Sequence, residues 1–216
     1  MYKISPQKTG VITFGISWNA APSADERLQS KNELLKKYFL GEDTVLYLFN
    51  GALDYAPNLD AVKNIVEKIN PIFIRKNISY KIIICGKNLP PEMNELKQYR
   101  DANIIYAGFV DDITTYFKGA DIFINPVTDG GGIKTKLVEA LGYNMNAVST
   151  NNGAIGVDAK ICNGKLLLCE NVDWQSFAYK MAEAALLINQ SIGKEFFDYF
   201  YWDNIAGKAA EIVNQL

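Results

Sequence analysis

The sequence contains no histidine among its 216 residues. This absence excludes a Ser-His-Asp triad or a Cys-His nucleophile within the chain, and with them histidine-ligated zinc and an imidazole base. Cysteine is scarce as well, because Cys85, Cys162 and Cys169 are an odd number without Cys-x-x-Cys spacing. We expect them to be buried thiols in a reducing compartment. Chemistry must therefore rest on carboxylates, Lys, Arg, hydroxyls and backbone dipoles, or on another domain.

Long hydrophobic runs and an excess of one charge are also missing. The longest apolar runs, such as residues 81–85, have the length of a strand, well short of the ~18 residues of a membrane span. The first ten residues lack the apolar core of a signal peptide. With 22 basic and 24 acidic residues, the formal charge of −2 gives no overall basis for binding nucleic acid. We expect a globular protein with no membrane span and no nucleic-acid partner.

Apolar segments of strand length alternate with amphipathic segments of helical period from Thr44 onward. This alternation predicts a mostly parallel sheet with helices on both faces. The expected fold class is α/β, a single Rossmann-like, doubly wound sheet of about six strands. The expected strands are 45–49, 80–85, 103–106, 120–124, 146–149 and 166–169. The expected helices are 58–74, 91–99, 112–118, 133–143, 174–188 and 202–216.

Residues 1–43 have a different pattern from the rest of the chain. Residues 11–14 could form a short strand, and residues 25–39 have the pattern of a charged amphipathic helix. The paired carboxylates Asp111-Asp112 follow a strand and open a helix, so we interpret them as a helix cap rather than a metal site. The aromatic run 199–202 is interpreted as packing of the terminal helix.

Ligands of doubly wound sheets bind at the carboxyl ends of the strands, where one segment stands out. The strand 120–124 leads through Asn125-Pro126 into the glycines 130–132 and then into a helix. Glycines allow a backbone to approach a ligand closely, and the start of a helix offers free N–H groups and a positive dipole to a phosphate. Lys134 and Lys136 lie in the first turn, where a bound anion would favour cations.

Glu139 lies three residues beyond Lys136 and so shares its helix face. Either the two form an ion pair without function, or Glu139 faces a ligand, and the spacing leaves both open. The segment is not a GxxxxGK[ST] phosphate loop, and no GxGxxG follows the first strand. Readings as a P-loop or a nicotinamide-cofactor protein are therefore weak.

The order of these motifs resembles the C-terminal half of the group 1 retaining glycosyltransferases of the GT-B fold. It is closest to the bacterial branch that builds cell-surface polysaccharides. The resemblance covers about residues 40–216 and is carried by residues 48–58, 84–86, 108–112, 120–121, 126, 130–140 and 149–156. GT-B enzymes have two Rossmann-like domains, of which the C-terminal one binds the nucleotide-sugar donor. The resemblance implies that 44–216 is this domain and 1–43 a linker and lead-in helix, with the N-terminal acceptor domain missing.

The resemblance also assigns roles to single residues. Glu139 matches the second glutamate of the family's E-x7-E pattern, which holds the ribose, and we expect Lys136 to neutralise the diphosphate; these two are the predicted catalytic residues. The predicted donor-binding residues are Asn50, Gly51, Phe109, Val110, Asp129, Gly130, Gly131, Gly132, Ile133 and Lys134. The chain departs from the family pattern at Gly131, which replaces the first glutamate. Ala52 and Pro57 stand where the family has an Arg and a Lys.

The implied reaction is hexosyl transfer with retention from a UDP- or GDP-type sugar, without a metal or another cofactor. The resemblance places the enzyme in the cytoplasm, where the full protein could associate peripherally with a membrane. This chain alone should be inactive, because the acceptor domain is absent. The alternatives are an interaction module that keeps the GT-B-like fold without donor binding, and a sugar-nucleotide epimerase. Glu139→Ala separates the donor-binding domain from the interaction module, because only a donor site would lose ligand binding without losing the fold.

Overall fold

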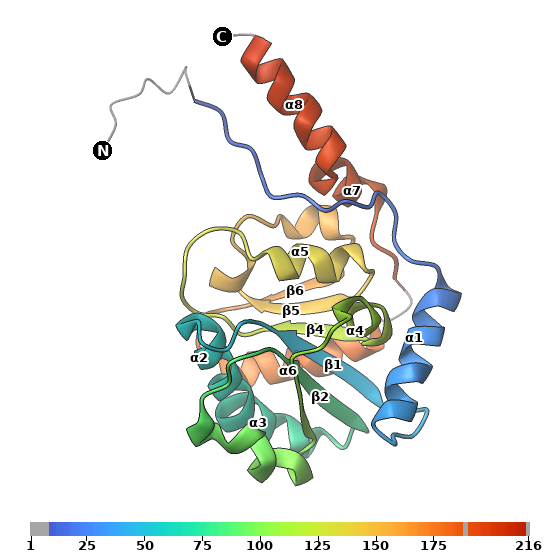
Figure 1. The fold of residues 1–216 in the computed structure, drawn as a ribbon, viewed down its shortest axis with the longest axis vertical. Coiled ribbons are helices and arrows are strands. Elements are labelled where there is room, and N and C mark those ends of the chain that lie inside the picture. The colour runs from blue at the N-terminus through green and yellow to red at the C-terminus, as the bar shows by residue number, and fades with distance from the viewer. Residues whose placement is uncertain (1–8, 188–189, 215–216) are drawn as a thin grey trace.

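A computed structural model describes residues 9–187 and 190–214 of the chain (Figure 1). Six parallel strands form one sheet in the order β3-β2-β1-β4-β5-β6. The strands are β1 (Val45–Asn50), β2 (Tyr80–Cys85), β3 (Ile104–Gly108), β4 (Ile122–Asn125), β5 (Asn146–Thr150) and β6 (Leu166–Cys169). From β1, strands β2 and β3 are added on one side of the sheet, and β4, β5 and β6 on the other. The boundary between β1 and β4 is therefore the switch point of a doubly wound fold. The predicted fold class is confirmed.

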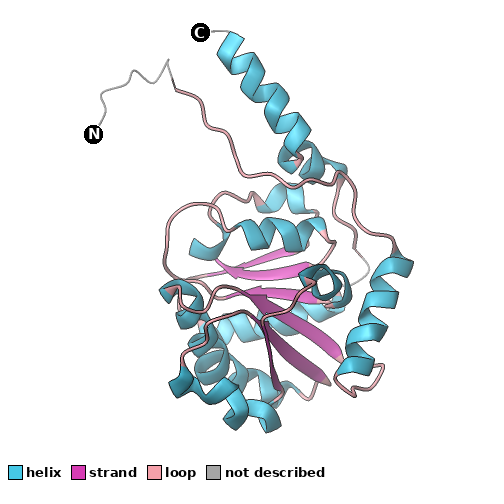
Figure 2. Cartoon of the chain, in the orientation of Figure 1, coloured by secondary structure: helices cyan, strands magenta, loops and turns pink. Residues whose placement is uncertain are grey.

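Helices cover both faces of the sheet and enclose two apolar cores (Figure 2). One core packs under α1 (Ala24–Lys37), α4 (Ile113–Gly119), α5 (Thr135–Gly142) and α7 (Lys194–Phe200). The other packs under α2 (Ala56–Asn64), α3 (Asn70–Phe73) and α6 (Trp174–Leu186). Because both faces are covered, the strands are apolar runs without alternation, as in β1, where Leu46 to Phe49 are all buried.

The ends of the helices follow from local hydrogen bonds. Ser23 and Glu26 form a reciprocal capping box at the start of α1. Asp112 accepts a hydrogen bond from the backbone N–H of Thr114 and caps α4, as expected. The helix expected from residue 58 begins earlier, because α2 starts at Ala56 and Asn58 lies inside it. Its side-chain amide instead donates to the carbonyl of Ala52 at 2.9 Å and holds the turn after β1.

The expected helix 58–74 is continuous but irregular. A π-helical turn (Ile65–Ile69) joins α2 to α3, and a 3-10 turn (Ile74–Lys76) ends it. Pro71 has no N–H for the carbonyl four residues back, so the regular ladder cannot run through this point. The expected helix 91–99 is a 3-10 segment (Pro91–Ala102) in which Asn94, Glu95 and Leu96 have left-handed backbone angles.

The two terminal segments run together along one side of the fold (Figure 1). The expected strand at 11–14 is wrong, because this segment is extended without strand pairing. An isolated bridge between Ile16 and Tyr201 follows it. Gly15 packs so closely on α8 (Trp202–Asn214) that an added Cβ would lie 2.7 Å from Ile205. The short helix α7 was not expected. The expected helix ends at 188 and at 215–216 lie outside the described residues.

The lead-in helix α1 is integrated into the fold, since it packs on α4 and buries Leu34 and Leu35. The domain boundary near residue 44 stays a prediction. The three cysteines are free and buried, as expected.

Candidate functional site

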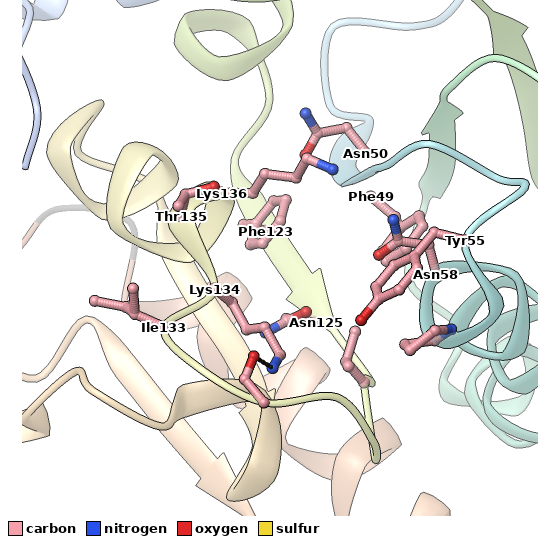
Figure 3. A pocket seen from close by; sticks show the side chains of 13 residues that line it. Phe49, Asn50, Tyr55, Asn58, Phe123, Asn125, Ile133, Lys134, Thr135 and Lys136 are labelled. Atoms are coloured by element: carbon pink, nitrogen blue, oxygen red, sulfur yellow. Dashed lines mark hydrogen bonds between the residues drawn. The ribbon is translucent and has the colours of Figure 1, made fainter. Parts of the chain in front are cut away.

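Two adjoining pockets open at the carboxyl ends of β1 and β4, where the strand order reverses. The switch pocket, of about 240 Å³, is lined by Phe49, Asn50, Tyr55, Pro57, Asn58, Phe123, Asn125, Val127, Gly131, Ile133, Lys134, Thr135 and Lys136 (Figure 3). The side pocket, of about 370 Å³, is lined by Asn50, Gly51, Ala52, Cys85, Gly86, Lys87, Phe109, Val110, Asp111, Ile113 and Lys136. Asn50 and Lys136 line both, so the two pockets adjoin at these side chains.

The end of β1 contributes a polar atom that has no partner. Asn50 Oδ1 is buried and accepts no hydrogen bond from the described residues. A buried amide oxygen without a donor costs free energy, so this position favours a ligand that supplies one. The next residue, Gly51, is needed for space, because an added Cβ would lie 2.8 Å from the Asn58 amide.

The end of β4 is tied to the end of β5 by buried polar side chains. The amide of Asn125 donates to Ser149 Oγ at 3.1 Å and to the Gly153 carbonyl at 2.8 Å. The Thr150 hydroxyl donates to the carbonyl of Val127 and accepts the Gly153 N–H. These bonds fix the start of the segment that follows β4.

That segment, residues 129–134, is here called the glycine loop. Gly130 and Gly132 have φ of +89° and +70°, a conformation that other residues rarely adopt. The Lys134 ammonium donates to the carbonyls of Gly130, Gly131 and Gly132 at 2.8, 3.3 and 3.2 Å. Figure 3 shows the Lys134 side chain among the residues that line the switch pocket. Partial burial lowers the pKa of Lys134, against the opposing charge of Asp129. Lys134, which we expected to bind the donor, therefore donates its hydrogen bonds to the loop itself.

Lys136 and Glu139 lie one turn apart on α5. Burial lowers the pKa of Lys136 and raises the pKa of Glu139, and in each case the charge of the other residue opposes the shift. Within the described chain no ion pair within 4.0 Å joins them, and Glu139 is not among the residues lining either pocket. Lys136 thus lines both pockets, and its role and the ribose contact of Glu139 stay predictions.

The far wall of the side pocket follows β3. Phe109 is 70% exposed directly after Gly108, and Val110 is half-buried beside it. A large exposed aromatic ring at the mouth of a pocket offers a face on which a flat base can stack. The Tyr106 hydroxyl donates to the Gly86 carbonyl at 2.9 Å and links the ends of β2 and β3 here.

Eight of the predicted site residues line one pocket or the other: Asn50, Gly51, Phe109, Val110, Gly131, Ile133, Lys134 and Lys136. Asp129, Gly130 and Gly132 lie in the glycine loop without lining a pocket; the Asp129 carboxylate accepts the Gly130 N–H at 2.6 Å. The sequence analysis missed Tyr55, Asn125 and Lys87. For Asn125, the last residue of β4, and Lys87, two residues beyond β2, the available signal was their place at the carboxyl end of a strand, which was applied to glycines but not to these residues. Tyr55 lies five residues beyond β1, directly before α2, and carried no such signal.

Two other kinds of feature are absent from the described residues. Within residues 9–187 and 190–214, no three His, Cys, Asp or Glu side chains gather in a way that could hold a metal ion. No helix in the same ranges is both long and apolar enough to cross a membrane.

Comparison with known proteins settles the family. The model of the family "Glycosyl transferases group 1" matches residues 44–186. The chain belongs to the group 1 glycosyl transferases. The resemblance noted in the motifs is confirmed at the level of the family and the fold.

Solved glycosyltransferases share this fold at low sequence identity. One from Rickettsia africae has a TM-score of 0.75 and 16% identity, and the match covers 99% of this chain and 58% of the Rickettsia chain. HepE from Anabaena in complex with UDP has a TM-score of 0.69 and 15% identity, and covers 96% of this chain and 57% of its own. A curated relative from Klebsiella pneumoniae, "Uncharacterized 44.6 kDa protein in cps region", is 28% identical over 137 residues, which are 58% of this chain and 35% of that protein. The chain thus spans little more than half the length of these structures and about a third of this relative.

Proposed function

We propose that this chain is the donor-binding half of a retaining glycosyltransferase and binds a nucleoside-diphosphate sugar of the UDP or GDP type. The observation that carries the proposal is the pair of adjoining pockets that share Asn50 and Lys136 in their lining. An aromatic ring lies at one end of this site, a lysine at its middle and a glycine-rich loop at the other end. A base, a diphosphate and a sugar have these requirements in the same order.

The middle of the site suits the diphosphate. Lys136 is partly buried, and its lowered pKa reflects the free energy that its charge costs there. A bound diphosphate would offset this cost and would also face the amino end of α5, where the helix dipole favours an anion. Lys136 is the cation that takes the place of the arginine and lysine for which the chain has Ala52 and Pro57.

The same groups would act on the reaction. In glycosyl transfer the bond between the anomeric carbon and the diphosphate breaks, and the oxygen of an acceptor hydroxyl bonds to that carbon and loses its proton. Negative charge therefore develops on the leaving diphosphate, and a fixed cation beside it lowers the barrier. We assign this role to Lys136 and propose that Glu139 positions it and contacts the ribose.

The comparisons support a nucleotide-sugar donor and a role in polysaccharide synthesis. HepE from Anabaena, which shares the fold, has been solved with UDP-glucose, and the Klebsiella pneumoniae relative is named for its cps region. We propose that a second domain supplies the acceptor site and that this chain alone transfers no sugar. We place the reaction in the cytoplasm of a bacterium, with the whole enzyme at the membrane surface.

Calorimetric titration with UDP and with GDP, in EDTA, tests the proposal. We expect one of the two to bind without metal at micromolar to millimolar affinity. Lys136→Met should weaken binding about tenfold or more, the effect of losing a charge-assisted hydrogen bond. Lys160→Met, at an exposed lysine that lines neither pocket, should leave it unchanged.

Failure of the wild-type chain to bind either nucleotide would contradict the proposal and favour the interaction module. Glu139→Gln adds a second arm, since it keeps the size of the side chain and removes its charge. A folded Glu139→Gln variant with weaker nucleotide binding supports the ribose contact, and unchanged binding removes it.

A further inference from the structure

β3 is an edge strand whose outer side has no partner in the sheet. It pairs only with β2, where Ile84 lies opposite Tyr106. In a parallel ladder a residue bonds to the two neighbours of the residue opposite it, so the N–H and the carbonyl of Tyr106 point away from β2. Neither group has a hydrogen bond to another described residue. Unpaired main-chain groups at an edge are a template for an added strand.

The sequence of β3 does little to block such pairing. Residues 104–107 are Ile-Ile-Tyr-Ala, without a charge or a proline. Charged side chains and prolines are among the devices by which proteins keep an exposed edge from pairing with other chains. Asn103 and Gly108, at the two ends, have φ of +66° and +67°, and the chain turns away there. The result is a short apolar edge with defined ends.

This edge lies in a groove of about 750 Å³ that runs along all of β3. One rim is the turn after α1, with Phe39, and the other is the 3-10 segment Pro91–Ala102, with Arg100. Leu40 of the first rim packs on one core and Leu96 of the second rim on the other, so the rims stand on opposite faces of the sheet. Two edges recessed in this way cannot meet. The groove therefore suits a single extended chain rather than the β3 of a second copy.

Both rims carry side chains on left-handed backbone, which residues other than glycine rarely adopt. Phe39 has φ of +55° and is 96% exposed. Its N–H donates to the Lys36 carbonyl, and the Leu40 N–H donates to the Leu35 carbonyl, a helix end that usually has glycine where Phe39 stands. On the other rim, residues 94–96 are left-handed in succession. Such strain costs free energy and concentrates at functional sites.

The groove also has positive charge without a counterion. Lys81 and Arg100 line it, and in the described part of the chain neither forms an ion pair within 4.0 Å. Lys81 donates to the neutral side chain of Asn103 at 2.9 Å. The one acid of the groove lining, Glu95, is paired with Lys97 at 2.7 Å. A complementary partner therefore brings carboxylates.

We propose that this groove binds an extended, acidic segment of a partner protein, which adds to β3 as a further strand. The main chain of the segment pairs with the N–H and the carbonyl of Tyr106, its carboxylates meet Lys81 and Arg100, and an apolar side chain packs against Phe39. In binding at a sheet edge, main-chain hydrogen bonds give affinity and side chains give specificity. The groove shares no lining residue with the switch pocket or the side pocket, so the inference does not rest on the proposed function.

Titration with three synthetic peptides of about seven residues, slightly longer than β3, tests the proposal. The first alternates valine and glutamate, and the second has lysine in place of glutamate. The third is the first with a central proline, which has no N–H for the ladder. The protein variants are Arg100→Glu, Phe39→Gly and, as a control, Arg75→Glu at an exposed arginine outside the groove. Amide exchange of Tyr106, followed by NMR, reports main-chain pairing.

We expect the glutamate peptide to bind with a dissociation constant of about 1 mM or lower, and the lysine and proline peptides about tenfold more weakly. Binding should slow the exchange of the Tyr106 amide. Arg100→Glu should reverse the preference between glutamate and lysine peptides, because it reverses the charge that they meet. Phe39→Gly should weaken binding about fivefold and yet raise the urea midpoint, because glycine removes the strain. A variant that merely misfolds cannot combine these two effects. Arg75→Glu should bind like the wild type.

Four results would overturn the inference. The first is no binding of the glutamate peptide at about 5 mM, or equal binding of all three peptides. The second is binding that leaves the exchange of the Tyr106 amide unchanged. The third is an equal loss of affinity in Arg75→Glu and Arg100→Glu, which would show unspecific attraction of charge. The fourth is a dimer in sedimentation that the peptide dissociates, which would make a second copy the occupant.

Discussion

The two ends of the parallel sheet differ in whether their polar groups have hydrogen-bond partners within the protein. At the amino end, Asp121 is 6% exposed and accepts hydrogen bonds at 2.9 Å from both Lys31 and the Leu46 N–H. Arg27 beside it donates to the carbonyls of Tyr143 and Ala120. These buried charges are satisfied by the chain itself.

At the carboxyl end, several polar groups have no partner within the described chain. The Asn50 oxygen is buried without a donor, and the N–H groups of Gly131, Gly132 and Ile133 are free. Lys136 is partly buried, and in the described chain it forms no ion pair within 4.0 Å with Glu139, whose charge opposes the lowering of its pKa. The contrast teaches that charge and burial alone do not mark a binding site. What marks it is a set of polar groups whose partners the fold does not supply.

The largest effect on the free energy of unfolding is expected at the amino end of the sheet, where the polar groups have partners. Asp121→Ala leaves Lys31 and the Leu46 N–H without their acceptor, so we expect a loss of about 3 kcal/mol in the free energy of unfolding. Urea denaturation measures this loss. Asp101→Ala, at an exposed carboxylate, should change it by less than ~0.5 kcal/mol. Equal stability of the two variants would remove the contrast between the ends.

A smaller effect is expected at Lys165, which precedes β6 at the same amino end. This side chain is 1% exposed and donates to the Gln190 carbonyl at 2.7 Å. Burial, with the charge of Arg27, lowers its pKa from 10.5 to about 8. Because the folded state disfavours the charged form, the native protein is destabilised below pH 8 and recovers stability as the pH rises toward 10.5.

Lys165→Met removes that penalty. At pH 7 we expect the variant to be more stable than the wild type by about 2 kcal/mol, a difference that shrinks between pH 8 and 10. Urea denaturation across this pH range measures it. A variant that is less stable at pH 7 would show that the bond to Gln190 outweighs desolvation.

At the carboxyl end, stability and binding should separate. Asn50→Ala removes an oxygen that has no partner, so the free energy of unfolding should change by less than ~1 kcal/mol. Nucleotide affinity should fall about tenfold if a ligand donates to this oxygen. Calorimetry and denaturation on the same protein measure both effects. Loss of stability without loss of affinity would make Asn50 a structural residue.

The smallest effect on stability is expected at Phe109, which is 70% exposed. Phe109→Ala should change the free energy of unfolding by less than ~0.5 kcal/mol. Loss of stacking on a base should weaken UDP or GDP binding by about 1 kcal/mol. Inorganic pyrophosphate, which has no base, should bind both proteins equally. A matching loss for pyrophosphate would place Phe109 outside the base subsite.

The sequence was sufficient for most of the sheet, because strands such as β1 are uninterrupted apolar runs between turn residues. It was insufficient for α7, a short helix rich in aromatic residues, and for residues 11–14, where packing against α8 decides the conformation. The candidate site was predicted because glycines follow the strands, and the structure has two pockets at this end of the sheet. The direction of Lys134 could not be predicted, since it depends on the left-handed backbone of Gly130 and Gly132. The nearness of Tyr55 to the loop is likewise a tertiary contact.

We propose that the carboxyl end of the sheet binds a nucleoside diphosphate while the amino end is purely structural. Amide hydrogen exchange with and without saturating UDP or GDP tests it most directly. We predict slower exchange in residues 50–58, 108–112 and 129–137, with no change in residues 24–38 or around Asp121 and Lys165. Protection at the amino end, or exchange that neither nucleotide alters, would contradict the claim.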